Sequence, residues 1–215
     1  MTNKIQTSLG KDKMSNKTIS WLKISGTCGI ITPSVAFSCI LLAMAYAPHF
    51  SWTDDALSDL GVMQSPTSTL FNLGLIAGGI LGVFFASGLL KLSKGKLPGQ
   101  IGALMFVLDC LALTAIGIFP ENAEPMHLYA SVAFFALFPL SMFFITASFI
   151  LASKKRTALF TFSIAVFAAV VWVAEFLVHY VPGVAIPETL SAIAASLWTV
   201  AFGFNMLEMS SHSTK

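Results

Sequence analysis

The chain has 215 residues, of which 56% are hydrophobic and only 10% are charged, whereas about 25% of the residues of a typical soluble domain are charged. Its mean hydropathy is +0.81, so a water-soluble fold is excluded, because a chain of this length cannot hide so much apolar surface from water. The net charge is only +2, and the basic residues form no patch beyond the first segment, which excludes a nucleic-acid-binding protein.

The chain begins with a polar segment, residues 1–25, that carries five lysines. We predict that this segment is a flexible cytoplasmic tail. The first apolar run, residues 26–47, is long enough to cross the ~30 Å of bilayer hydrocarbon as a helix, which takes ~20 residues. A long polar start and a run of spanning length are not typical of a cleaved secretory signal.

Five further apolar runs follow at residues 70–92, 101–119, 128–152, 158–181 and 190–206. They are continuous runs and not alternating ten-residue segments, so they exclude a membrane β-barrel. The sequence therefore predicts an all-α fold, in which residues 26–206 form one bundle of six transmembrane helices. A short tail, residues 207–215, completes the chain.

Basic residues divide the connections between these runs into two classes. All Lys and Arg residues lie in the first segment, at 91–96, at 154–156 and at Lys215, and the other three connections contain none. Basic connections stay in the cytoplasm. We therefore predict a multi-pass protein of the cell membrane with both termini in the cytoplasm and three acidic connections facing outward.

The first outward connection, residues 48–69, reads as a short helix at the membrane interface. Thr53 or Asp54 is suited to cap its start, and Gly61 is suited to end it. Asp55 and Asp59 are four residues apart, so we expect them to share one face of this helix.

The second run carries glycines at every fourth position, Gly74, Gly78 and Gly82. Small residues at this spacing let another helix approach closely, which is a main route to helix association in lipid. We predict that this face packs against a neighbouring helix of the same chain. The alternative is that it joins two copies of the chain.

Two carboxylates are predicted to lie inside the membrane. Asp109 is ~15 Å below the outward end of the third run and Glu175 is ~9 Å below that of the fifth. A charged Asp at the bilayer centre costs about 2.5–3.5 kcal/mol, and no Lys or Arg lies within a run to pair with it, because Lys91 is at the inward end of the second run. Each acid is therefore protonated and hydrogen-bonded, lines a wet cavity, or holds a cation or polar ligand.

Histidines add to this polar outer half. His179 follows Glu175 by four residues, so we expect the pair to share a helix face, where a carboxylate orients an imidazole. The sequence predicts that a set of polar residues converges in an outward-opening pocket and binds a ligand: Asp59, Asn72, Asp109, His127, Glu175 and His179. Ser58, Gly61 and Glu121 are expected to support it.

The sequence predicts no metal and no cofactor. His127 and His179 with one carboxylate would supply three metal ligands, but the H-x-x-E-H and H-E-x-x-H spacings are absent. No catalytic serine motif, phosphate-binding loop or dinucleotide motif is present either, so catalytic residues are not assigned.

Several short motifs resemble one family. They are Ser58-Asp59-x-Gly61, then Phe71-Asn72-x-Gly74, then Pro120-Glu121 followed by His127 and Phe134-Phe135. Over about residues 26–206 the chain resembles domain-of-unknown-function family 998, whose members are uncharacterised and largely archaeal membrane proteins. It is distantly similar to the six-span DRAM and FRAG-type proteins, several of which handle lipids. The resemblance implies the fold and the importance of Ser58, Asp59, Gly61, Asn72, Pro120 and His127, but it implies no activity.

The leading hypothesis is a protein that handles a lipid or another amphipathic ligand in the outward pocket. One alternative is a membrane-embedded hydrolase or lipid-modifying enzyme, which requires His and carboxylate within ~3 Å of each other or one water apart. Another is a non-catalytic subunit of a larger complex that docks through the glycine face. Expected partners are membrane lipids and, in the alternatives, a second copy or other membrane subunits.

Overall fold

Six long helices make up the fold. The computed structural model describes residues 16–212, and its helices are α1 (Asn16–Ala45), α2 (Ser68–Leu92), α3 (Leu97–Ile118), α4 (Met126–Leu151), α5 (Lys155–Val178) and α6 (Ala185–His212). Each of the six is long and apolar enough to cross a membrane. The prediction of an all-helical multi-pass membrane protein is confirmed.

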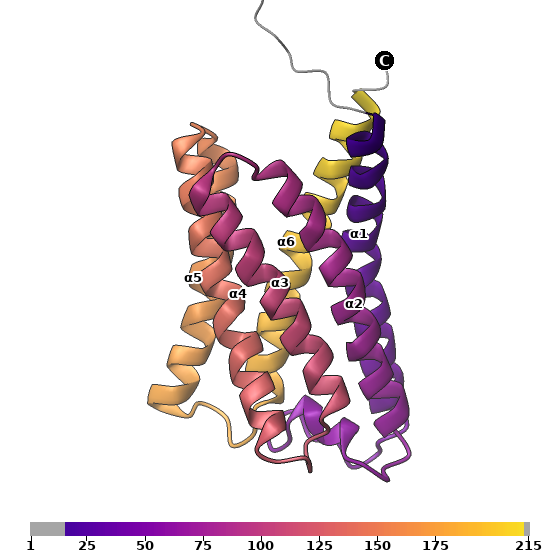
Figure 1. The fold of residues 1–215 in the computed structure, drawn as a ribbon. Helices are drawn as coiled ribbons and strands as arrows, with labels where there is room; N and C mark the ends of the chain where they lie inside the picture. Colours follow the sequence, from indigo (N-terminus) through magenta and orange to yellow (C-terminus); the bar gives the residue numbers. More distant parts are fainter. Residues whose placement is uncertain (1–15, 213–215) are drawn as a thin grey trace, which may run out of the picture.

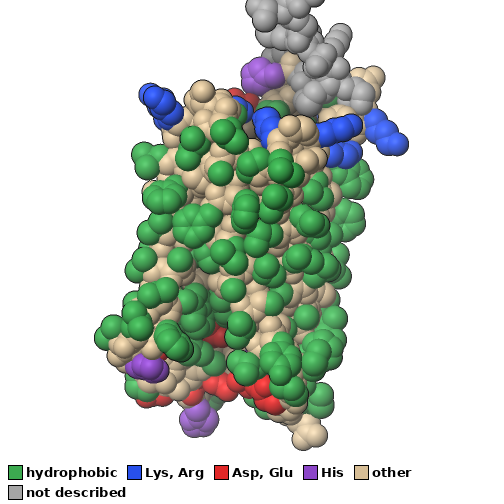
Figure 2. Space-filling model, turned by 60° about the vertical axis from the view of Figure 1, so that its left-hand side comes forward, with side chains coloured by type: hydrophobic (Ala, Val, Ile, Leu, Met, Phe, Trp, Pro, Cys, Tyr) green, Lys and Arg blue, Asp and Glu red, His purple; other side chains and the backbone are tan. Residues whose placement is uncertain are grey.

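The helices stand side by side, and each packs against the next in chain order until α6 returns to α1 (Figure 1). The described chain starts and ends at one end of the bundle, together with the links 93–96 and 152–154. Basic side chains gather at this basic end, and acidic side chains gather at the opposite, acidic end (Figure 2). The acidic end carries connections 46–67, 119–125 and 179–184. That the basic end faces the cytoplasm stays a prediction.

All six helices begin before their predicted spans, and two of them extend furthest toward the basic end. α1 begins at Asn16, so residues 16–25 are helical and not a flexible tail, while residues 1–15 of that predicted tail lie outside the described residues. Leu22 in this stretch is fully buried, and Trp21 donates a hydrogen bond to Ser87 Oγ of α2 at 2.9 Å. α6 likewise continues to His212, past the predicted end at 206. Hydropathy marks only the part of a helix in lipid, whereas packing continues both helices beyond it.

Aromatic side chains fill the half of the bundle nearer the basic end. Trp198 stacks on Phe202 with ring centroids 4.2 Å apart, and Phe85 and Phe106 meet Trp198 edge-on or tilted. The indole N–H of Trp198 donates to Thr161 Oγ1 of α5 at 3.1 Å, which ties α5 to α6. These large rings separate a pocket at the basic end, lined by Lys96 and Lys154 among others, from the cavities nearer the acidic end.

The glycine face of α2 lies inside the bundle. A side chain at Gly74 would collide with Cys39 of α1, and one at Gly82 would come within 2.7 Å of Cys110 Sγ of α3. Both neighbouring helices belong to the same chain. This face is therefore covered by helices of the same chain, as predicted, and partners of the protein stay an expectation.

The first connection at the acidic end contains η1 (Leu57–Gly61), a short 3-10 helix. It ends at Gly61 as predicted, but it begins after Ala56, so the predicted caps Thr53 and Asp54 were wrong. The reason is local competition, because both side chains bond to nearby hydroxyls in the preceding turn.

The predicted pairing of Asp55 and Asp59 on one helix face was also wrong. Asp55 lies before η1, and its Oδ2 accepts the backbone N–H of Ser51 at 2.7 Å. Asp59 Oδ2 accepts the N–H of Ala56 at 2.8 Å and so caps η1. Each carboxylate satisfies a separate turn, and the two do not form one charged face. The position of η1 at a membrane interface stays a prediction.

Candidate functional site

η1 is held against the bundle at both of its ends. At its start, the buried Glu188 of α6 accepts the backbone N–H of Leu57 on Oε2 at 2.6 Å. At its end, Asn72 of α2 donates to the carbonyl of Gly61 at 2.9 Å. A side chain at position 61 would come within 2.5 Å of Asn72 Oδ1, so only glycine lets α2 approach this closely. The buried Leu57 and Ser58 thus cover the interior of the bundle.

Two adjoining cavities lie beneath η1. The first, which we call the vestibule, lies among η1, the α3–α4 connection, α4, α5 and α6. The second, the inner cavity, is narrower and lies among α1, α2, α3, α4 and α6. They adjoin because Ser58, Ser131, Phe135 and Glu188 line both.

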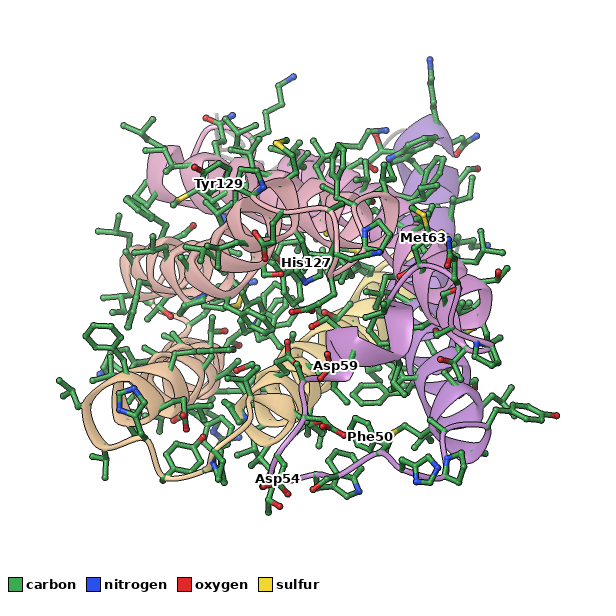
Figure 3. All side chains as sticks on the ribbon, turned by 90° about the horizontal axis from the view of Figure 1, so that it is seen from below. Phe50, Asp54, Asp59, Met63, His127 and Tyr129 are labelled. Carbon is green, nitrogen blue, oxygen red and sulfur yellow. The ribbon has the colours of Figure 1, made fainter. Side chains whose placement is uncertain are left out.

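The vestibule holds most of the ionisable side chains, and its central group is His127 in the first turn of α4. The side chain is only 5% exposed and lies near the middle of the acidic end, whereas Asp54 lies at the rim (Figure 3). His127 Nδ1 is 2.8 Å from the carbonyl oxygen of Phe119. A carbonyl only accepts, so Nδ1 carries a hydrogen and the ring orientation is fixed.

The other ring nitrogen of His127 faces two side chains. Nε2 lies 3.2 Å from Glu121 Oε2 and 3.3 Å from Ser131 Oγ. When Nε2 is also protonated, the ring is a cation paired with the Glu121 carboxylate. When it is not, Nε2 accepts the Ser131 hydroxyl hydrogen. The vestibule therefore contains a histidine whose charge depends on a neighbouring acid.

The surroundings of Glu121 favour its charged form. The hydrogen bond from His127 lowers the pKa of the Glu121 carboxyl, partial burial opposes this, and a hydrogen bond from Ser58 lowers the pKa further. Glu121 is therefore ionised at neutral pH and supplies a fixed negative charge to the vestibule.

We expect this pair to make folding stability depend on pH. The pKa of Glu121 is lower in the folded protein than in the unfolded chain. The pair therefore stabilises the fold at pH values above the unfolded-state pKa, and this contribution is lost as the pH falls through the folded-state pKa. The melting temperature of wild type should thus fall more than that of Glu121→Gln as the pH is lowered from about 5 to about 3. Glu124→Gln, an exposed acid in the same connection, should follow wild type. Identical pH profiles for wild type and Glu121→Gln would contradict this.

Asp109 lies deeper, on the wall of the inner cavity. It is 3% exposed, and no described protein group forms a hydrogen bond to its Oδ1. Most of the surrounding wall is apolar, with Phe106, Leu113 and Ile116 from the same helix. The carboxyl is thus an ionisable group on a mostly apolar wall.

The structure does not bring the other four predicted ligand-binding residues into these cavities. Asp59 is exposed and caps η1, and Asn72 clamps η1 to α2. Glu175 is buried on α5 and lines neither cavity. The predicted Glu175–His179 face was wrong, because α5 ends at Val178 and the exposed His179 turns into the left-handed region with φ +47°.

A different set of residues meets in their place. Ser58 and Glu121, expected only as support, line the vestibule beside His127. The sequence interpretation missed Glu188, because this acid precedes the predicted run at residues 190–206, whereas α6 begins at Ala185. It also missed Ser131, although its position one helical turn after His127 was a usable signal. Within residues 16–212, no group of three His, Cys, Asp or Glu side chains is placed to hold a metal ion, so the set with His127 and His179 does not form.

Comparison with known proteins identifies a family. A family model described as "Protein of unknown function (DUF998)" matches residues 30–205, a region that contains the lining of both cavities. No curated protein and no solved structure matches the chain. The chemistry of the cavities must therefore be argued from the residues themselves.

Proposed function

This chain belongs to the DUF998 family, as its motifs predicted, and we propose that it binds a membrane lipid, with the headgroup in the vestibule and the acyl chain in the inner cavity. The observation that supports this is the continuity of two largely apolar cavities, of which the vestibule carries most of the ionisable side chains. The vestibule holds His127, Glu121 and Glu188, and the inner cavity is lined mainly by apolar side chains. A molecule with a polar end and an apolar body matches both at once.

The opening of the vestibule favours a lipid over a water-soluble ligand. Leu128 and Val132 of α4 line the vestibule and are also 51% and 59% exposed on the side of the bundle. Trp172 of α5 lines the vestibule opposite them. Figure 2 looks toward the α5 side and shows an acidic side chain recessed in a hollow among apolar ones. In a bilayer this side faces acyl chains, so a lipid enters between α4 and α5 without crossing water.

The charged side chains of the vestibule restrict which headgroups can bind there. Glu121 and Glu124 line it together with one histidine, so two carboxylates face one possible cation. A phosphate or free carboxylate on the ligand would be repelled, whereas hydroxyl or amine groups find acceptors. The proposed ligand therefore has a neutral or cationic headgroup rich in hydrogen-bond donors, such as that of a monoacylglycerol.

The test is a binding measurement with a fluorescent monoacylglycerol on the purified protein in detergent. We expect His127→Ala to weaken binding about tenfold, since losing a buried polar partner costs ~1–3 kcal/mol. Glu121→Gln, which removes the charge but keeps the shape, should weaken it less. His179→Ala is the matched control, because this histidine is exposed and lines neither cavity. If both His127 and Glu121 variants bind like wild type, the proposal fails.

A second candidate, the membrane hydrolase, has one specific observation in its favour. His127 lies within about 3.3 Å of both a carboxylate and the Ser131 hydroxyl, which meets the distance that acid–base chemistry requires. However, Glu121 and Ser131 face the same ring nitrogen, so a proton held there by Glu121 leaves no base for Ser131. The arrangement favours binding. Labelling by a fluorophosphonate that Ser131→Ala abolishes would favour catalysis instead.

A further inference from the structure

The inner cavity contains a carboxyl group, that of Asp109, to which an unsubstituted acyl chain cannot form a hydrogen bond. Asp109 lines this cavity, is 3% exposed, and its Oδ1 has no hydrogen-bond partner among the described residues. A buried carboxyl left without a partner is costly in an apolar environment. Binding a plain hydrocarbon chain beside it would leave that cost in place.

The other polar groups deep in the inner cavity do not satisfy Asp109. Thr32 of α1 donates its hydroxyl hydrogen to the carbonyl of Cys28 at 2.8 Å. Ser196 and Thr199 of α6 each donate to a carbonyl of their own helix at 2.7 Å. Each of the three hydroxyls has used its only hydrogen and offers lone pairs to the cavity. Together with Asp109 of α3, these hydroxyls of α1 and α6 present hydrogen-bond acceptors to the same space. A ligand that supplies a hydrogen-bond donor is complementary to them.

Depth fixes where along the ligand this donor must lie. Asp109 lies about 13 Å below the acidic end of α3, at ~1.5 Å rise per residue. His127 lies in the first turn of α4, about 2 Å below the same end on the same scale. The two groups are therefore separated by about 11 Å along the bundle axis. A lipid with its headgroup at His127 places the middle of its chain, and not its end, beside Asp109.

We propose that Asp109 makes the inner cavity selective for lipids that carry a hydroxyl group partway along the acyl chain, with this hydroxyl donating a hydrogen bond to the carboxyl. The inference rests on the proposed lipid-binding function and adds the substrate class. It assigns Asp109 the role of a specificity-determining residue that contacts the ligand, and it assigns no reaction.

The experiment compares two monoacylglycerols that differ at the chain. Monoricinolein carries one mid-chain hydroxyl and monoolein lacks it, and each displaces a fluorescent monoacylglycerol from the purified protein. Wild type should bind monoricinolein about tenfold more tightly, the effect of one hydrogen bond to a buried acceptor. Asp109→Leu should bind the two lipids equally. Asp109→Asn, which keeps an acceptor oxygen and nearly the same shape, should retain most of the preference.

Thr146→Val is the matched control, because Thr146 is also buried with an unpartnered hydroxyl but lines neither cavity. It should keep the preference of wild type. Equal binding of both lipids by wild type, with His127 still required, overturns the selectivity and leaves the lipid-binding function standing. Binding of neither lipid overturns both. A preference that persists in Asp109→Leu also overturns the role of Asp109, and the wild-type comparison stands even if that variant does not fold.

Discussion

Gly79→Ala is expected to lower the free energy of unfolding by about 3 kcal/mol, the upper part of the range for overpacking a tight contact. A Cβ at this position would lie 2.6 Å from the carbonyl oxygen of Cys110 and 2.8 Å from the backbone nitrogen of Thr114. Both atoms belong to the backbone of α3, which does not move aside as a flexible side chain does. The methyl group would therefore push α2 and α3 apart.

Gly78→Ala is the matched control for this effect. The nearest atoms to a Cβ at Gly78 are Ala36 Cβ at 3.4 Å and Leu113 Cδ2 at 3.8 Å, which are ordinary contacts. Alanine is also a better helix former than glycine by about 1 kcal/mol. We expect the melting temperature of Gly78→Ala, followed by tryptophan fluorescence in detergent, to equal or exceed that of wild type. Similar melting temperatures for the two variants would contradict the close α2–α3 contact.

The second large effect is expected at Glu188. Glu188→Ala leaves the Leu57 N–H without its buried acceptor and should destabilise the attachment of η1 by about 2 kcal/mol. Amide hydrogen exchange in residues 56–61 should then rise by more than tenfold. Because Leu57 and Ser58 line the cavities, loss of this anchor should also weaken monoacylglycerol binding.

Two variants test whether the acceptor oxygen of Glu188 is what holds η1. Glu188→Gln keeps an acceptor oxygen, so exchange in residues 56–61 should stay close to that of wild type. Glu124→Ala removes a nearby acid that is exposed and should leave exchange unchanged. Fast exchange in wild type itself, or equal exchange in Glu188→Ala and wild type, would show that this hydrogen bond does not hold η1.

The glycines of α2 show how far spacing alone predicts packing. Their four-residue repeat predicted a closely packed face, and Gly74 and Gly82 do meet α1 and α3. Yet the tightest backbone contact belongs to Gly79, which is outside that repeat, while Gly78 within it has room for a methyl group. Helix rotation relative to two neighbours decides this, and spacing along one helix contains no information about it.

In the candidate site, too, the sequence predicted some of the residues and the packing of the helices decided the others. The sequence singled out His127 and Asp109, since a histidine at the mouth of a span and an acid inside one are each unusual. It paired Glu175 with His179 by assuming a helix that continues, whereas α5 ends at Val178. The actual partner of His127 is Glu121, and a turn in the α3–α4 connection brings the two within 3.2 Å. Which residues meet across a connection depends on the path of the backbone.

The sequence by itself determined the number of spans, the helical class and the charge asymmetry between the two ends of the bundle. These follow from local composition, because every membrane span must be apolar and satisfy its own backbone hydrogen bonds. Only the tertiary structure decided which residues face the cavities. A soluble helix marks its buried face with apolar residues, but in lipid both the buried and the exposed faces are apolar. The hydropathy pattern therefore does not show which side of each helix faces the interior. The tertiary structure is needed to see that Ser58, Glu121, His127 and Glu188 lie together.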